Sequence, residues 1–179
     1  MKATGIVRRI DDLGRVVIPK EIRRTLRIHE GDPLEIYTDA NGEVIFKKYS
    51  PVGEMSGFAE QYAEVLSKVA RQPVLISDND HIVAAAGISK KEMLERRISP
   101  MLEDYIMGRK SYFAGTSGVP PLYPVENIER NAAIMYPIIA AGDVTGSVIL
   151  LFNESNTPPT ETENKLIQTA AAFLGRQSE

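Results

Sequence analysis

The sequence predicts two domains: an N-terminal, all-β-dominated domain with one short helix, and a C-terminal α+β domain. Three observations support this prediction. The first fifty residues alternate short β-branched runs with turn signals, the remainder mixes helical and strand periodicity, and Ser50-Pro51-Val52-Gly53 between them has the composition of a linker. The predicted boundaries are a first domain at residues 1–51, a linker at 52–55 and a second domain at 56–179.

The first domain is predicted to have the element order β-β-α-β-β. Asp11-Asp12-Leu13-Gly14 is a turn sequence between two β-branched runs, and Pro19 suits the first position of a helix, where its missing N–H is not needed. Asn41-Gly42 between two further strand-like runs is a strong hairpin signal. The predicted elements are strands at 4–10 and 15–18, a helix at 20–27, and strands at 34–38 and 43–48.

This first domain is too small to be comfortably stable by itself. Four very short strands and one short helix bury little apolar surface, and domains below about 70–80 residues usually need a disulfide, a metal or a partner. The sequence contains no cysteine, which excludes disulfides and thiolate metal sites and suits a reducing compartment. We therefore expect this domain to be an obligate dimer.

Charge is distributed unevenly along the chain. The whole sequence has a net charge of −3, which by itself argues against nucleic acid. Residues 1–27, however, contain eight basic and three acidic side chains, a local charge of +5, whereas residues 51–179 have a local charge of −5. Such asymmetry indicates a basic contact surface at one end of an otherwise acidic protein.

The basic side chains of the predicted short helix are sorted onto one face. At about 100° per residue, Ile22 and Leu26 form an apolar stripe. The side chains on the opposite face are all basic: Lys20, Arg23, Arg24 and Arg27. A two-fold dimer doubles this face into a surface suited to the phosphate backbone of duplex DNA.

Four motifs of the first domain resemble the AbrB-type transition-state regulators. They are Thr4-Gly5-Ile6-Val7-Arg8, Asp12-Leu13-Gly14-Arg15-Val16-Val17-Ile18-Pro19, Glu21-Ile22-Arg23-Arg24-Thr25-Leu26 and Leu34-Glu35-Ile36-Tyr37. The resemblance implies a swapped-hairpin barrel in which two chains interleave and bind DNA as a dimer. The family's DNA-contacting arginines match Arg8, Arg15, Arg23 and Arg24, and Arg9 lies where relatives usually also have a base. With Lys20 and Arg27 added from the helical face, the predicted DNA-binding residues are Arg8, Arg9, Arg15, Lys20, Arg23, Arg24 and Arg27.

The second domain is predicted to be an antiparallel sheet with helices packed against it. Thr160-Glu161-Thr162-Glu163 fits a capping box, and Ser99-Pro100 interrupts a helical stretch. The predicted elements are a helix at 54–71, strands at 74–76 and 81–85, one or two helices within 90–107, a loop at 111–133, strands at 135–140 and 145–152, and a helix at 160–176.

This second domain resembles a GAF domain. The motifs are the polar turn Asp78–Asp80 and the run from Tyr136-Pro137-Ile138 through Gly142 and Gly146 to the strand at 148–150. The resemblance implies that helices 54–71 and 160–176 bundle with those of another chain to form a homotetramer, and that a small molecule of unknown identity is sensed. The combination of the two domains resembles transcription regulators of spore-forming bacteria that have an AbrB-type head and a GAF-like tail. We therefore expect a sequence-selective transcription regulator of sporulation genes that acts as activator, repressor or both.

No catalytic or metal-binding constellation is found in the sequence. Asp78, Asp80 and His81 are typical of a polar hairpin turn, and Gly115-Thr116-Ser117-Gly118 lacks the lysine of a phosphate loop. We therefore expect no enzyme activity, no cofactor and no metal. The longest apolar run, 148–152, is far too short to cross a membrane, and no secretory signal is seen. A cytoplasmic, nucleoid-associated protein is expected.

Two alternatives remain open. The first is an antitoxin-like interaction module of the MazE kind, which binds a toxin through its tail. The second is a ligand-sensing enzyme built on the C-terminal domain, which the shortage of nucleophiles and bases disfavours. The loop at 111–128 either covers a ligand pocket or is a plain surface connection.

Overall fold

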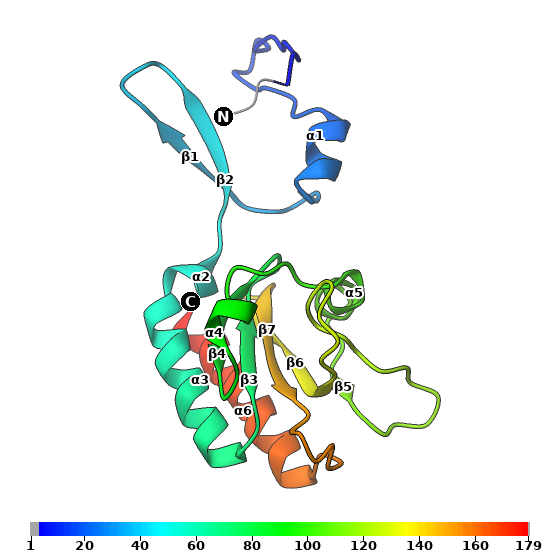
Figure 1. Ribbon diagram of the computed structural model, residues 1–179. Coiled ribbons are helices and arrows are strands. Elements are labelled where there is room, and N and C mark those ends of the chain that lie inside the picture. Colours follow the sequence, from blue (N-terminus) through cyan, green and yellow to red (C-terminus); the bar gives the residue numbers. More distant parts are fainter. Residues whose placement is uncertain (1–3, 179) are drawn as a thin grey trace. The chain divides into compact units, whose positions relative to one another are not determined.

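The computed structural model describes residues 4–178, and these divide into two compact units (Figure 1). The division falls between Tyr49 and Ser50. We call Met1–Tyr49 the head and Ser50–Glu179 the tail, and each is described by itself. The expected two-domain fold class, with a small strand-containing head and an α+β tail, is confirmed.

A β-hairpin dominates the regular structure of the head, as Asn41-Gly42 predicts. Strands β1 (Leu34–Thr38) and β2 (Val44–Lys48) are antiparallel, with Leu34 opposite Lys48 and Thr38 opposite Val44. Asp39 closes the loop, because its Oδ1 accepts hydrogen bonds from the backbone N–H groups of Asn41 and Glu43 at 3.0 and 2.8 Å. Gly42 has φ +81°, a left-handed conformation that glycine adopts without steric cost.

The strands expected at 4–10 and 15–18 are not formed, and this part of the prediction is wrong for the single chain. Their sequences are rich in β-branched residues, but no other described segment of the chain pairs with them. A strand needs a neighbour to accept and donate its backbone hydrogen bonds, so a β-prone segment without one remains irregular. Between them, residues 11–15 form the tight turn that the sequence indicates.

The short helix also ends earlier than expected. Helix α1 (Lys20–Thr25) is followed by Arg27 in the left-handed region, with φ +51°. The backbone N–H of Ile28 donates to the Arg23 carbonyl at 2.8 Å, which closes the helix end with a Schellman-type bond. Arg27 therefore lies beyond the helix. The prediction that it belongs to the basic face of the helix, which assumed a rotation of about 100° per residue up to position 27, is wrong.

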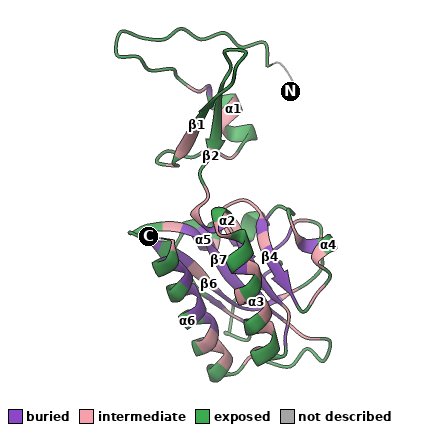
Figure 2. Ribbon diagram, turned by 90° about the vertical axis from the view of Figure 1, so that its left-hand side faces the viewer, coloured by how far each residue is buried: buried purple, intermediate pink, exposed green. Residues whose placement is uncertain are grey.

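The head has almost no interior. Among residues 4–49, Pro19 alone is buried, and most side chains are exposed (Figure 2). Val7 is 90% exposed, and Leu26, expected in an apolar stripe, is 52% exposed. No other described part of the chain covers these side chains. The predicted stripe therefore exists as a sequence pattern but is not buried within one chain.

The tail is built on one five-stranded antiparallel sheet with strand order β4-β3-β7-β6-β5 (Figure 1). Its strands are β3 (Val74–Ser77), β4 (Ile82–Ala86), β5 (Tyr112–Phe113), β6 (Ala132–Ala140) and β7 (Asp143–Leu151). Its helices are α2 (Pro51–Glu54), α3 (Ser56–Ala70), α4 (Lys90–Met93), α5 (Pro100–Met107) and α6 (Glu161–Gln177). Helices α3 and α6 cover one face of the sheet, and α4, α5 and the loop before β6 cover the other.

The strands of the tail alternate between two apolar layers. Val74 and Ile76 pack toward α3 and α6, whereas Leu75 between them packs toward α5, as the period of two in a strand requires. Both layers are buried, so the central strands are apolar on both faces. On the α6 side, Gly175 lies directly against the Ile139 backbone carbonyl, which lets the helix approach β6 closely.

Several details of the tail differ from the sequence prediction. The stretch 52–55, expected to be a linker, contains most of α2, and Val52 is fully buried in the tail core. β5 lies inside the expected loop 111–133, because Tyr112 and Phe113 pair with Met135 and Ile134. The capping box at Thr160 is confirmed, with both reciprocal hydrogen bonds present. In the described part of the chain, no helix is both long and apolar enough to span a membrane.

Candidate nucleic-acid interface

The turn at residues 11–15 fixes the position of Arg15. The Asp11 carboxylate accepts hydrogen bonds from the backbone N–H groups of Leu13 and Arg15 at 3.0 and 2.8 Å. Its second oxygen accepts from the Arg15 side-chain Nε at 2.8 Å. The backbone N–H and the guanidinium of Arg15 hold the pKa of Asp11 below its ordinary value. Arg15 is thus held by a local carboxylate while remaining exposed.

Arg8 and Arg9 lie in the irregular segment before this turn, and both are exposed. Within the described residues they belong to no helix or strand, so nothing regular sets the direction of their side chains. Lys2, which contributes to the positive charge of the first 27 residues, lies outside the described residues.

Helix α1 brings three of the expected basic residues together. Lys20, Arg23 and Arg24 lie within its 6 residues, with Lys20 and Arg24 exposed and Arg23 half-buried. Thr25 at the end of the helix donates from its hydroxyl to the Glu21 carbonyl at 2.8 Å. The helix thus presents a compact group of cations, as the sequence pattern predicts for these three positions.

Arg27 is placed differently from the other basic residues. It is half-buried beyond the end of α1, and its backbone carbonyl accepts a hydrogen bond from Lys48 Nζ at 2.6 Å. The same ammonium lies 3.7 Å from Asp32 Oδ2, and His29 Nδ1 lies 3.6 Å from that oxygen. The loop between α1 and β1 is therefore tied to the end of β2.

Sequence reasoning missed two of these structural partners. The sequence analysis places Asp11 only in a turn, although an acid four residues before Arg15 across a turn is a signal for this ion pair. Lys48 was assigned only to a strand, and its contact with Arg27 joins residues 21 positions apart, which no local pattern indicates.

The described residues contain no cluster of three or more His, Cys, Asp or Glu side chains that could hold a metal ion. The candidate at Asp78 is a polar turn, as expected: Asp78 Oδ1 accepts from the backbone N–H groups of Asp80 and His81, both at 2.7 Å. Its other oxygen accepts from the Ser50 hydroxyl at 2.9 Å. This carboxylate is therefore used in joining the first turn of the tail to the sheet.

Comparison with protein families defines the class of this chain. Residues 54–179 match the family "Stage V sporulation protein T C-terminal, transcription factor". Residues 7–53 match the family "Antidote-toxin recognition MazE, bacterial antitoxin". The two matches meet between Gly53 and Glu54, so the fold and the matches together define a transcription factor with a small basic head and an α+β tail.

Individual relatives lead to the same assignment. The chain is 51% identical over 179 residues to stage V sporulation protein T of Bacillus subtilis (strain 168), which covers 100% of this chain and 99% of the relative. The chain therefore belongs to the stage V sporulation protein T family of sporulation transcription factors. This is a family of regulators, not of enzymes.

Two further likenesses concern the head and the tail separately. The head is 65% identical over 51 residues to transition state regulatory protein AbrB of Bacillus subtilis (strain 168), across 28% of this chain and 52% of AbrB. A type II free methionine-R-sulfoxide reductase from Thermoplasma acidophilum aligns with 69% of this chain and 92% of its own, with a TM-score of 0.52 and 10% identity. At that identity, the likeness shows a shared fold of the tail only.

Proposed function

We propose that this transcription factor binds duplex DNA through the basic residues of its head. The proposed contacts are Arg8, Arg9, Arg15, Lys20, Arg23, Arg24 and Arg27. In this proposal the head forms the DNA-binding domain and the tail forms a sensing and oligomerisation domain. The protein acts in the cytoplasm at the nucleoid, as activator or repressor of sporulation genes. The observation that carries the proposal is the group of cations on and around α1, most of which are exposed.

The exposed apolar surface of the head supports a swapped-hairpin dimer. Ile10, Leu13 and Val17 are each at least two-thirds exposed. Ile10 and Val17 lie in the segments expected to be strands, Leu13 lies between these segments, and no other described segment of the chain pairs with them. A second copy of the head supplies both the missing hydrogen-bond partners and the missing core. The dimer places two sets of arginines on one surface, which is what a duplex backbone requires.

An aromatic cluster on the tail supports a homotetramer formed through helices 54–71 and 160–176. Phe58, Tyr62 and Phe173 pack with ring centroids 5.4–6.1 Å apart, and Phe58 and Phe173 remain 39% and 42% exposed. These rings come from α3 and α6, which lie side by side on the same face of the sheet (Figure 2). Exposed aromatic area of this kind is typical of an interface between chains.

The head offers mainly arginine for DNA contacts, so recognition is expected to depend on DNA shape and deformability as well as on base edges. Binding of a small molecule by the tail is proposed to modulate this recognition.

A second candidate function is that of an antitoxin-like protein-interaction module with a swapped-hairpin head. The match of residues 7–53 to the antitoxin family favours this candidate. Copurification of a stable partner protein, together with weak intrinsic DNA binding, would favour that candidate.

The test of DNA binding uses two arginine pairs of the same chain. Arg23→Ala with Arg24→Ala is expected to lower duplex affinity by at least about 100-fold, because each dimer loses four cations from the contact surface. Arg96→Ala with Arg97→Ala removes the same charge from exposed positions of the tail and is expected to leave affinity unchanged. The measurement is fluorescence anisotropy with labelled duplex DNA at several salt concentrations.

Three readouts accompany this measurement. Affinity of the unmodified chain should fall steeply with salt, by about 0.9 in log K per neutralised phosphate for each decade of salt. Sedimentation should show the same oligomer size for both double variants. Affinity retained in the Arg23/Arg24 variant would overturn the proposed interface.

A further inference from the structure

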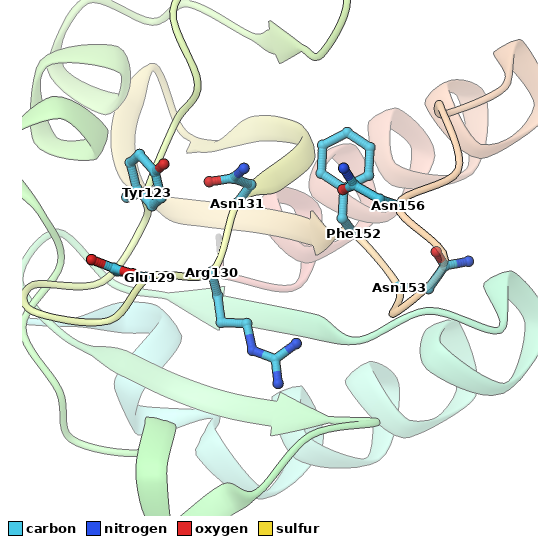
Figure 3. Close-up of a pocket in the computed structure, with 7 residues that line it drawn as sticks. All are labelled: Tyr123, Glu129, Arg130, Asn131, Phe152, Asn153 and Asn156. Atoms are coloured by element: carbon cyan, nitrogen blue, oxygen red, sulfur yellow. The ribbon is translucent and has the colours of Figure 1, made fainter.

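A small hollow opens at the end of the tail sheet where strand β6 begins and strand β7 finishes (Figure 3). Because these strands are antiparallel neighbours, the residue before β6 meets the residue after β7: the Phe152 backbone N–H donates to the Asn131 carbonyl at 3.1 Å. The hollow has a volume of about 250 Å³. Pockets for drug-sized ligands begin at roughly 300 Å³, so this hollow suits a smaller metabolite.

Three asparagines and two aromatic rings form much of its wall. Figure 3 shows Asn131 between Tyr123 on one side and Phe152, Asn153 and Asn156 on the other. The turn after β7 is ordered by its own hydrogen bonds, since the Asn153 carbonyl accepts from the Asn156 N–H at 3.0 Å. The hollow therefore combines amide groups with apolar ring surface on a fixed turn.

One amide oxygen in this hollow has no donor. Asn131 Oδ1 is buried and accepts no hydrogen bond from the described residues. Among the described residues, the side-chain oxygens of Gln72 and Asn79 are also buried without a hydrogen-bond donor, but neither residue lines the hollow. A buried acceptor without a donor costs free energy, and native proteins usually supply a partner. A molecule in the hollow that donates a hydrogen bond to Asn131 would satisfy this oxygen.

One negatively charged and one positively charged side chain also line the hollow. Glu129 and Arg130 both line it, both are exposed, and neither forms an ion pair within the described part of the chain. A dianion would be repelled by Glu129, and a diamine would be repelled by Arg130. A ligand with one group of each charge matches both side chains.

We propose that this hollow binds a small zwitterion of free amino-acid size. This inference rests on the proposed modulation of the tail by a small molecule, and it gives that molecule a site and a chemical class. The ligand carboxylate pairs with the Arg130 guanidinium, which is shaped for two parallel hydrogen bonds to a carboxylate. The ligand ammonium donates to Asn131 Oδ1 and to the Glu129 carboxylate. The rings of Tyr123 and Phe152 cover its apolar part.

The binding test uses the full chain and the twenty free L-amino acids as probes, one at a time. At least one is expected to raise the thermal midpoint saturably, because it binds the folded state alone. Its N-acetyl derivative lacks the ammonium and its carboxamide lacks the carboxylate, so both are expected to fail. Absence of a shift with every free amino acid, or an equal shift with both derivatives, would overturn the proposal.

Variants separate ligand binding from a structural role of the same residues. Arg130→Gln and Glu129→Gln are each expected to weaken binding of that amino acid at least tenfold in calorimetry, whereas Arg96→Gln, an exposed arginine outside the hollow, leaves it unchanged. Asn131→Leu removes the unpaired buried oxygen, so it is expected to raise the ligand-free midpoint while abolishing the ligand-dependent shift. Wild-type affinity in Arg130→Gln contradicts the proposal.

Duplex affinity of each preparation is measured in parallel. Intact DNA binding without amino-acid binding overturns this inference alone. Failure of the unmodified chain to bind duplex DNA would instead overturn the proposed function.

Discussion

At the residue scale, the basic side chains of the head differ in how firmly they are held. Arg15 is joined to Asp11 through both its backbone and its guanidinium, whereas Arg8 and Arg9 lie in an irregular segment. An arginine held in one direction loses less side-chain entropy on meeting a phosphate than a mobile one does. Among the proposed DNA contacts, Arg15 is therefore expected to lose the least side-chain entropy on binding.

The two turn carboxylates of the head give a pH prediction. Hydrogen bonds from the backbone N–H and the guanidinium of Arg15 lower the pKa of Asp11 from its ordinary value of 3.8. The hydrogen bond from the Glu43 backbone N–H is the main cause that lowers the pKa of Asp39 from the same value. A folded-state pKa that is lowered adds stability above the unfolded pKa, and this stability is lost as the pH falls through the folded value. Acidification below about pH 4 should therefore loosen both turns.

Carboxyl-carbon NMR titration of the full chain measures both values. Arg15→Ala is expected to raise the pKa of Asp11, because a charged donor is lost, and to leave that of Asp39 unchanged. Equal pKa values of Asp11 in the two proteins would show that the guanidinium does not hold the carboxylate.

At the element scale, local signals in the sequence succeed where the interactions are local. The hairpin at Asn41-Gly42 and the capping box at Thr160 both form as predicted, because every group involved lies within a few residues. The end of α1 and the strand β5 were missed. The left-handed conformation that ends α1 falls on Arg27 and not on a glycine, so the sequence does not indicate it. Strand β5 forms only because it pairs with β6, about twenty residues further along the chain.

Packing of α6 on β6 gives a prediction for two glycines. A Cβ at Gly175 would overlap the Ile139 carbonyl oxygen, so Gly175→Ala is expected to destabilise the tail by about 1–3 kcal/mol, although alanine favours a helix. Gly57 in α3 has open space around it, and Gly57→Ala is expected to stabilise by about 0.4–1 kcal/mol. Urea unfolding followed by circular dichroism compares the two. A stabilising Gly175→Ala would contradict the close approach.

At the scale of the whole molecule, head and tail differ in how complete each one is. The tail buries two apolar layers on both faces of its sheet, whereas the described head buries Pro19 alone. A unit without a core is stable only with a partner, so the stability of the head is expected to depend on protein concentration. The acidic tail has its own core and does not share this requirement.

Assembly through the tail is tested at its aromatic cluster. If the proposed tetramer forms through this cluster, Phe173→Glu is expected to convert it into a dimer, because a charge at an apolar contact is costly to desolvate. Met101 on α5 is 38% exposed and lies outside this cluster, so Met101→Glu should leave the proposed tetramer intact. Analytical ultracentrifugation distinguishes the species. A tetrameric Phe173→Glu protein would place the interface elsewhere.

The sequence by itself determined the two-domain class, the hairpin, most tail elements and the sorting of Lys20, Arg23 and Arg24 onto one helix. Each of these depends on periodicity or on neighbours a few residues apart. Only the tertiary structure decided that 4–10 and 15–18 have no strand partner in their own chain and that Arg27 leaves the helix. It alone brought Asn131 beside Phe152 to form a hollow. Contacts between distant segments are set by packing, and a local pattern does not encode them.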